Sequence, residues 1–365
     1  MIQWPQKSTN MFREMMDLSQ GISARRQYDA LDLMKFIVSI MIVAMHSKAL
    51  SGAGSAAQFW LCQIPARIGV PFFFITSSFL LFSKHPEPNR CLDKKSFQHF
   101  VKRILSLYGF WFCVNLPWIF YVRIYEKGLS LQTVESFIKQ ALFSSTFKGS
   151  WYLMSTVFSA CFIYWLGKKL STSKLLALSF LVYAFCISTS AYSGLLNAEF
   201  LQTVKTVFVF PPNSILAGVF YFTLGKWIAE HQDALFRISR KWDLGLIFLF
   251  SIIAYVEIYL LKSANVLGET DCFVSLIPLS IFLFLFLCTS HVRIPRCATL
   301  RKASTVIYCL HGMCIPAVGF LSTALGFQDY FLIRFLMIIA ICLLATFVIL
   351  RLEKIPAFRW LRVAH

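Results

Sequence analysis

Long uncharged runs of apolar residues recur along the chain. Five of them contain no Asp, Glu, Lys or Arg, namely 104–122, 149–167, 175–198, 206–225 and 272–290. At about 1.5 Å per residue, each run is long enough to cross about 30 Å of hydrocarbon as a helix. One such run is also compatible with a buried core helix, but this number of runs indicates a membrane protein.

The runs and the polar breaks between them predict an all-α, polytopic membrane helix bundle of about ten transmembrane helices. The predicted spans lie near 31–50, 65–83, 104–123, 150–167, 175–191, 209–229, 244–261, 272–290, 304–325 and 330–350. Two segments have open alternatives. Residues 129–147 form an amphipathic outer helix or a half-inserted loop, and residues 192–213 form a short outer helix or part of the sixth span.

Composition and charge placement agree with this pattern. Hydrophobic residues make up 58% of the chain and charged residues only 14%, which excludes an ordinary soluble surface. The net charge of +18 does not indicate nucleic-acid binding, because the Lys and Arg residues lie in short breaks between apolar runs. Alternate breaks hold 25 basic residues on one side and six on the other. The bilayer is therefore the expected partner, and both termini are expected in the cytoplasm.

The same reasoning divides the chain into three parts. Residues 1–30 are a polar cytoplasmic segment without a predicted signal peptide, residues 31–350 are the membrane domain, and residues 351–365 are a cytoplasmic tail. The eleven cysteines are scattered singly, with no CxxC pair and no Cys/His spacing that suits zinc. We therefore expect no metal site, and expect the thiols to pack as small apolar groups.

The first predicted span carries an unusual stripe of polar residues. On a helix, His46 projects only about 20° from Lys35, and Ser39 and Asp32 lie within about 60° of it. Polar groups inside a membrane helix are costly and usually face a cavity. One interpretation makes His46 a general base on the wall of a polar channel. The other makes Asp32 and Lys35 interfacial residues and His46 a histidine satisfied by a neighbouring helix.

At these positions the chain resembles the integral-membrane acyltransferase 3 family. In that family a basic residue, usually Arg, precedes a His of the first helix by eleven positions, as Lys35 precedes His46. Arg67 and the stretch GVPFFFITSSF are similar to the family's Arg-containing GVxxFFxxSGF signature. The further matches, in chain order, are Lys102-Arg103-Ile104, Tyr108, Trp151-Tyr152-Leu153, Phe222 to Gly225, and Ser304 with Tyr308 and His311.

The chain departs from the family pattern at three positions. Lys35 replaces the commoner Arg, which keeps the charge but loses the bidentate fork. Ser78 stands where Gly usually follows Ser77, and Thr156 stands where one branch has a Glu. The chain is more similar to the WYL branch, so the resemblance assigns no catalytic carboxylate to that helix.

The resemblance implies a multi-pass O-acyltransferase of a bacterial inner (plasma) membrane. Acetyl-CoA is the expected acyl donor, no permanently bound cofactor is expected, and the expected acceptor is a hydroxyl of a cell-surface or lipid-linked glycan. His46 would be the base or a transient acyl carrier. The other expected site residues are Lys35, Arg67, Tyr308 and His311 for catalysis, Lys35, Lys102 and Arg103 for the donor, and Trp151, Tyr152 and Asp32 for the acceptor.

Other interpretations remain open on the sequence. Tyr308 and His311 either serve the site or only hold the bundle together. Glu257 and Arg334 are expected to be structural pair partners or functional groups. A transporter or flippase of a glycan intermediate, without acyl chemistry, would suit ten spans and intramembrane charge equally well.

Overall fold

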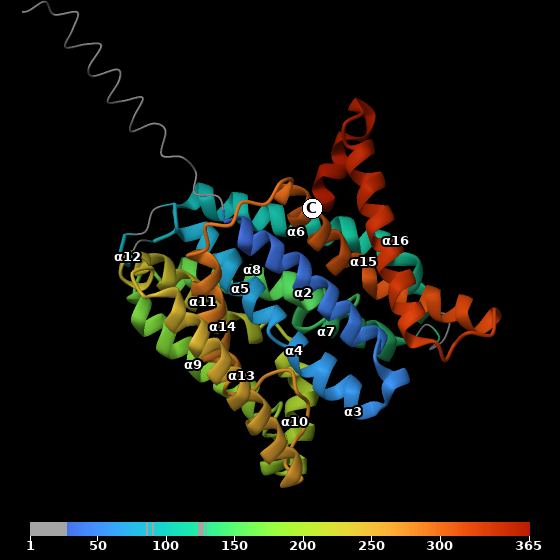
Figure 1. The fold of residues 1–365 in the computed structure, drawn as a ribbon, viewed down its shortest axis with the longest axis horizontal. Helices are drawn as coiled ribbons and strands as arrows, with labels where there is room; N and C mark the ends of the chain where they lie inside the picture. Colours follow the sequence, from blue (N-terminus) through green and yellow to red (C-terminus); the bar gives the residue numbers. More distant parts are fainter. Residues whose placement is uncertain (1–27, 85–86, 90, 123–127, 129) are drawn as a thin grey trace, which may run out of the picture.

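A computed structural model describes residues 28–365 except 85–86, 90, 123–127 and 129, so most of the predicted segment 1–30 lies outside the described residues. Every regular element of the described part is a helix (Figure 1). The main helices are α2 (Asp29–Ser47), α3 (Ser55–Ala57), η2 (Gln58–Gln63), α4 (Ile64–Ala66), α5 (Gly69–Phe82), α6 (Lys94–Phe120), α7 (Leu131–Phe143), α8 (Ser150–Leu166), α9 (Thr172–Ser188), α10 (Ala198–Phe208), α11 (Ala217–Glu230), α12 (Gln232–Leu235), α13 (Arg240–Ser263), α14 (Leu276–Cys288), α15 (Cys297–Ala324), α16 (Phe331–Leu352) and η6 (Pro356–Ala364).

The all-α prediction is confirmed for the described residues, and each of the ten predicted spans coincides with helical structure. Seven helical stretches are long and apolar enough to cross a membrane. The apolar helices α8, α9 and α14 are shorter, at 17, 17 and 13 residues. The fold is therefore that of a multi-pass membrane protein, while the total of ten spans stays a prediction.

The two segments with open alternatives both contain amphipathic helices. Residues 129–147 include α7, and residues 192–213 include α10, which ends at Phe208. Val209 follows at a positive φ of 63°, and Pro211 and Pro212 prevent α10 from running straight into α11. Residues 192–213 are therefore largely a short separate helix.

Two spans begin earlier than predicted. The Asp93 carboxylate accepts a hydrogen bond from the Ser96 N–H at 2.9 Å, so α6 starts at Lys94 and includes the basic residues before 104. Similarly, α15 starts at Cys297, which places Ser304 about two turns inside the helix and not at its end. The charged residues before 104 and before 304 do not separate helices, because they occupy the first turns of α6 and α15.

The centre of the bundle is α5, which packs tightly against α11. Phe72, Phe74 and Phe79 of α5 are fully buried. The two backbones approach so closely that a Cβ on Gly225 would lie 2.5 Å from the Ile75 carbonyl oxygen. Glycine has no Cβ and so permits this contact. Small residues at such a contact are typical of membrane helices, where close packing replaces the hydrophobic effect.

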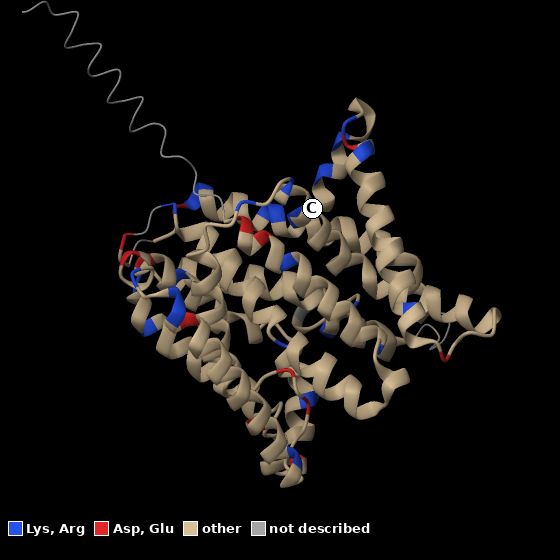
Figure 2. Ribbon diagram, in the orientation of Figure 1, with Lys and Arg blue, Asp and Glu red and all other residues tan. Residues whose placement is uncertain are grey.

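The outer faces of α13 and α16 expose apolar side chains and so fit contact with lipid. The exposed residues are Leu244, Phe248, Leu249, Ile252, Ile253, Val256, Tyr259 and Leu260 on α13, and Leu332, Ile333, Leu336, Ile341, Leu343, Leu344, Phe347 and Val348 on α16. Lys and Arg gather at the end of the bundle where α2, α6 and α15 begin (Figure 2). This distribution agrees with the alternating charge of the breaks.

Glu257 lies within α13 and has a structural role. Its carboxylate accepts hydrogen bonds from the Tyr192 hydroxyl at 2.7 Å, from the Val274 N–H at 2.8 Å, and from the N–H and hydroxyl of Ser275. The last two residues precede α14, so a carboxylate from α13 caps the N-terminal end of α14. Of the two earlier interpretations, Glu257 therefore fits the structural one.

Replacing Glu257 with Gln should lower the free energy of unfolding by about 2 kcal/mol, because one carboxamide oxygen cannot accept from all four donors. The measurement is the thermal unfolding midpoint in detergent. The matched control is Glu269→Gln, since Glu269 is exposed, and its midpoint should stay within about 1 °C of wild type. Equal midpoints for the two variants would show that the cap does not stabilise the fold.

Candidate active site

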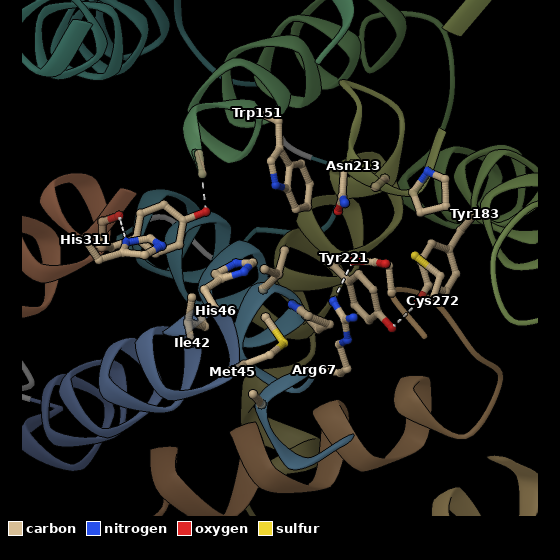
Figure 3. A pocket seen from close by; sticks show the side chains of 18 residues that line it. Ile42, Met45, His46, Arg67, Trp151, Tyr183, Asn213, Tyr221, Cys272 and His311 are labelled. Carbon is tan, nitrogen blue, oxygen red and sulfur yellow. Dashed lines mark hydrogen bonds and ion pairs between the residues drawn. The ribbon is translucent and has the colours of Figure 1, made fainter. Parts of the chain in front are cut away.

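A pocket opens within the bundle (Figure 3). Its walls come from the end of α2, the break between α4 and α5, the start of α8, α9, the middle of α15, and the start of α11 with the segments before α11 and α14. The lining residues are Ile42, Met45, His46, Ala66, Arg67, Val70, Pro71, Gly149, Trp151, Tyr183, Pro212, Asn213, Ala217, Tyr221, Asp271, Cys272, Tyr308 and His311. On α2 the lining begins at Ile42, so the pocket occupies the half of the bundle opposite the basic end.

Two imidazoles meet on one wall of this pocket. His46 of α2 and His311 of α15 have ring centroids 5.5 Å apart and nearly parallel planes, 15° apart. They approach because α15 packs along α2. The packing of these two helices therefore brings both rings to one wall of the pocket.

The two rings differ in their hydrogen bonds. His311 is fully buried, and its Nδ1 lies 2.7 Å from the Tyr308 carbonyl oxygen. Its Nε2 is buried and has no hydrogen-bond partner among the described residues. The ring of His46 is partly exposed to the pocket and likewise has no hydrogen bond to a described residue.

The loop before α8 is held against α15 beside these rings. The Tyr308 hydroxyl donates to the Gly149 carbonyl at 3.0 Å, and a Cβ on Gly312 would lie 2.7 Å from the Lys148 Cβ. Gly149 has a positive φ of 86°, which favours glycine. Lys148 thus lies near both imidazoles, and desolvation together with the Lys48 ammonium lowers the pKa of Lys148.

Replacing Gly312 with Ala should push this loop off α15, because the added methyl group cannot fit against Lys148. We expect about 1–3 kcal/mol of destabilisation, measured by thermal unfolding. Gly319→Ala, in the same helix, is the control, because its nearest neighbour would lie 3.7 Å away. Equal behaviour of the two variants would contradict the importance of this close contact.

The opposite part of the pocket is formed by an ion pair. The Arg67 Nη1 lies 2.6 Å from the Asp271 Oδ1, and the Arg67 Nε donates to the Thr270 hydroxyl at 3.2 Å. Both charged side chains are only 13% exposed. The predicted span 65–83 places Arg67 at its start, and this boundary is wrong. A helical segment from Ser55 precedes it, and Arg67 lies at the break between α4 and α5.

The ion pair keeps polar atoms turned toward the open space. The Arg67 Nη2 and the Asp271 Oδ2 have no hydrogen bond to a described residue, and neither is among the fully buried polar atoms. The Asn213 amide, in its hydrogen-bonded orientation, donates to the Asp271 Oδ1 at 3.3 Å. Trp151 forms a neighbouring aromatic wall (Figure 3). The pocket thus pairs an imidazole side with an ion-pair side.

A second polar cluster lies toward the basic end of the bundle. The Asp32 carboxylate pairs with Lys35 at 3.5 Å and with Arg301 at 3.0 Å. Arg103 is close enough to interact electrostatically with both Lys35 and Arg301. Lys35 and Arg301 therefore share one carboxylate, and Arg103 adds a third positive charge nearby. Ser39, between Lys35 and the pocket, donates to the Phe36 carbonyl of its own helix at 2.8 Å.

The structure divides the predicted site residues into two groups. The pocket collects His46, Arg67, Trp151, Tyr308 and His311. The predicted residues away from its lining are Asp32, Lys35, Lys102, Arg103 and Tyr152. Of these, Lys102 is exposed on α6, and Tyr152 packs behind the pocket with its ring 5.6 Å from the Tyr308 ring.

Sequence analysis missed three polar residues that complete these clusters. Asp271 and Asn213 lie in segments between helices, where helical projection carries no information. Arg301 was counted only as a topology-determining charge, although it pairs with Asp32. The signal available for Asp271 was its acidic character near the end of an otherwise uncharged span.

The chain is similar to one known protein family and to several curated proteins. A family profile described as an acyltransferase domain, of the acyltransferase 3 type, matches residues 28–351. Two curated proteins of Enterococcus faecalis, each named amino-acid racemase, are 23% and 21% identical over 70% and 90% of this chain, which cover 35% and 47% of their own length. A serine/alanine racemase of Enterococcus gallinarum is 21% identical over 85% of the chain and 44% of its own length. The chain thus spans about a third to a half of these relatives, and no solved structure gives a significant match.

Proposed function

The chain belongs to the acyltransferase 3 family, and from this premise we propose that it transfers an acyl group, acetyl first of all, from acyl-CoA to a hydroxyl of a cell-surface or lipid-linked glycan. The observation that carries the proposal is the pair of imidazoles in a pocket that also holds an ion pair. Imidazoles serve both as bases and as nucleophiles in acyl transfer. We further propose a bacterial inner membrane location, ten spans and cytoplasmic termini.

The donor is proposed to bind at the basic end of the bundle. CoA carries several phosphate groups, and the cluster of Lys35, Arg103 and Arg301 around Asp32 has excess positive charge. Charge-assisted hydrogen bonds to phosphate are among the stronger polar contacts. Lys102, exposed beside this cluster, adds to the attraction at long range. The thioester would then extend along α2 toward His46.

The acceptor is proposed to enter from the opposite end, where the pocket lies. A sugar ring can stack on Trp151 while its hydroxyls bond the open atoms of Arg67 and Asp271. In this arrangement the imidazole side would face the hydroxyl that is acylated. Tyr152 supports the site from behind and does not contact the acceptor.

A second candidate acceptor is a small amino acid with a hydroxyl group. The Arg67–Asp271 pair favours this candidate. The Arg67 Nη2 can donate to the carboxylate of an amino acid, and the Asp271 Oδ2 can accept from its ammonium group. The relatives, by their names, act on amino acids, including serine. This candidate uses the same acyl chemistry and changes only the acceptor.

The test is purified protein incubated with radiolabelled acetyl-CoA and one of three acceptors: a methyl glycoside of N-acetylglucosamine, a polyprenyl-diphosphate-linked sugar, or L-serine. We expect label in an ester of one acceptor, and the acceptor that is labelled decides between the two candidates. If vesicles containing the protein translocate the lipid-linked sugar while acetyl-CoA is not consumed, the alternative of a flippase without acyl chemistry is correct.

Lys35→Ala should raise the KM for acetyl-CoA by about tenfold and change kcat little, because it removes one charge-assisted contact to phosphate. Lys35→Arg should restore or improve binding, since a guanidinium can bond a phosphate with two N–H groups. Lys94→Ala is the control, as Lys94 is exposed at the same end. An unchanged KM in Lys35→Ala would assign Lys35 only to the pairing with Asp32.

A further inference from the structure

His311 has a single hydrogen-bonding arrangement that fixes its proton. A carbonyl oxygen accepts and never donates, so the Nδ1 bonded to the Tyr308 carbonyl at 2.7 Å must carry a hydrogen. The Ile307 carbonyl lies on the same side, 3.3 Å from that nitrogen. The neutral ring therefore has its lone pair on Nε2, which is buried, has no partner among the described residues, and belongs to a ring that lines the pocket.

His46 differs from His311 in its exposure and in its hydrogen bonds. Its ring is partly exposed to the pocket and makes no hydrogen bond to a described residue. It lies eleven positions after Lys35, on the same face of α2. A group that forms a temporary covalent bond needs such access, whereas a base needs a fixed lone pair.

We propose that His311 is the general base of the acyl transfer and that His46 is the acyl carrier. This division of roles rests on the proposed function and goes beyond it, because it gives each imidazole a separate step. The Tyr308 hydroxyl and the Arg67 guanidinium are already engaged by other partners. The Tyr308 hydroxyl donates to the Gly149 carbonyl at 3.0 Å, and Arg67 is paired with Asp271.

In the first step a ring nitrogen of His46 attacks the thioester carbon of acyl-CoA. The carbon–nitrogen bond forms, the carbon–sulfur bond breaks, and the thiolate takes the proton from the other ring nitrogen of His46. In the second step the acceptor hydroxyl gives its proton to the His311 Nε2 while its oxygen attacks the acyl carbon. The carbon–nitrogen bond then breaks, and His311 returns the proton to His46.

The separation of the rings suits this sequence. A reacting hydroxyl oxygen must lie about 2.8 Å from its base and about 3 Å from the acyl carbon. Centroids 5.5 Å apart leave room for one oxygen that reaches both groups (Figure 3). Both rings line the same pocket with centroids 5.5 Å apart, so the acceptor does not have to move between steps.

The test compares wild type, His311→Asn, His46→Ala and the exposed control His99→Asn, each with radiolabelled acetyl-CoA. The Asn amide can keep the hydrogen bond to the Tyr308 carbonyl but offers no basic nitrogen, which separates the chemical role from a structural one. Two second substrates are used: the hydroxyl acceptor identified in the preceding assay, and hydroxylamine, which attacks acyl-imidazoles without a base. Thermal unfolding confirms that each variant folds.

We expect His311→Asn to accumulate about one equivalent of label on the protein and to form acetohydroxamate at nearly the wild-type rate. Its transfer to the hydroxyl acceptor should fall by about 10²–10⁴-fold. His46→Ala should show neither labelling nor hydroxamate, and His99→Asn should match wild type. Transfer to the hydroxyl by His311→Asn at the wild-type rate would overturn its role as base. Wild-type transfer with no protein-bound label would overturn the carrier role, whereas no acetyl-CoA consumption by wild type would overturn the proposed function itself.

Discussion

Replacing His46 with Ala should lower kcat/KM for acyl transfer by at least about 10³-fold, because no other imidazole in the pocket can replace the one that meets the donor. The His311 ring centroid lies 5.5 Å from that of His46, but its Nδ1 is hydrogen-bonded to the Tyr308 carbonyl. We assign its Nε2 to the second step, in which the acceptor hydroxyl is deprotonated. The measurement is the initial rate of label transfer from acetyl-CoA in detergent, with the donor varied from below to above its KM at saturating acceptor.

The matched control for this prediction is His99→Ala, since His99 is exposed on α6 and distant in sequence from every pocket residue. Both variants should unfold at temperatures close to wild type, because His46 makes no hydrogen bond to a described residue. If the His46 variant is folded and still transfers label at more than a tenth of the wild-type rate, His46 does not take part in the chemistry.

The second large effect concerns the ion pair between Arg67 and Asp271. Removing the Asp271 carboxylate should cost about 3–5 kcal/mol, because it leaves a guanidinium that is only 13% exposed without its counter-charge. Removing both side chains should cost less than the sum of the two single changes. The measurement is a double-mutant cycle of thermal stability with Arg67→Ala, Asp271→Ala and the double variant.

The internal comparison for this cycle is the exposed pair of Lys139 and Glu135 on α7. Its side chains are 43% and 64% exposed, so the corresponding cycle should yield about 0.5 kcal/mol or less. Acceptor binding gives an independent readout with the variant Arg67→Lys, which keeps the charge but loses the guanidinium fork. Its KM for the acceptor should rise, whereas its KM for acetyl-CoA should not change. Additive single changes would mean that the Arg67–Asp271 contact contributes little.

Most of the helical architecture could be predicted from the sequence, because a bilayer requires long apolar helices and leaves few alternatives. The alignment of Lys35 and His46 on one face of α2 follows from helical periodicity and needs no tertiary information. The boundaries were less predictable. The charged first turns of α6 and α15 are helical, since capping by Asp93 and packing of α15 on α2 extend both helices past the apolar runs.

The site was only partly predictable for a related reason. Periodicity identifies which side of a helix a residue occupies, but it says nothing of segments between helices, from which Asp271 and Asn213 reach the pocket. The polar stripe of α2 also divides into two environments. Lys35 joins Asp32 and Arg301, whereas His46 joins His311, and Ser39 between them bonds its own helix. Only the packing of α15 against α2 determines this division.

The most direct test of the account is a sidedness assay in proteoliposomes whose orientation is established by cleavage of a terminal tag. Labelled acetyl-CoA is supplied on the side of the basic end, where Lys35 lies, and the acceptor on the side of the pocket. The account predicts that label crosses to the acceptor in wild-type vesicles and does not in His46→Ala vesicles. Transfer that occurs only when donor and acceptor share one compartment would contradict it.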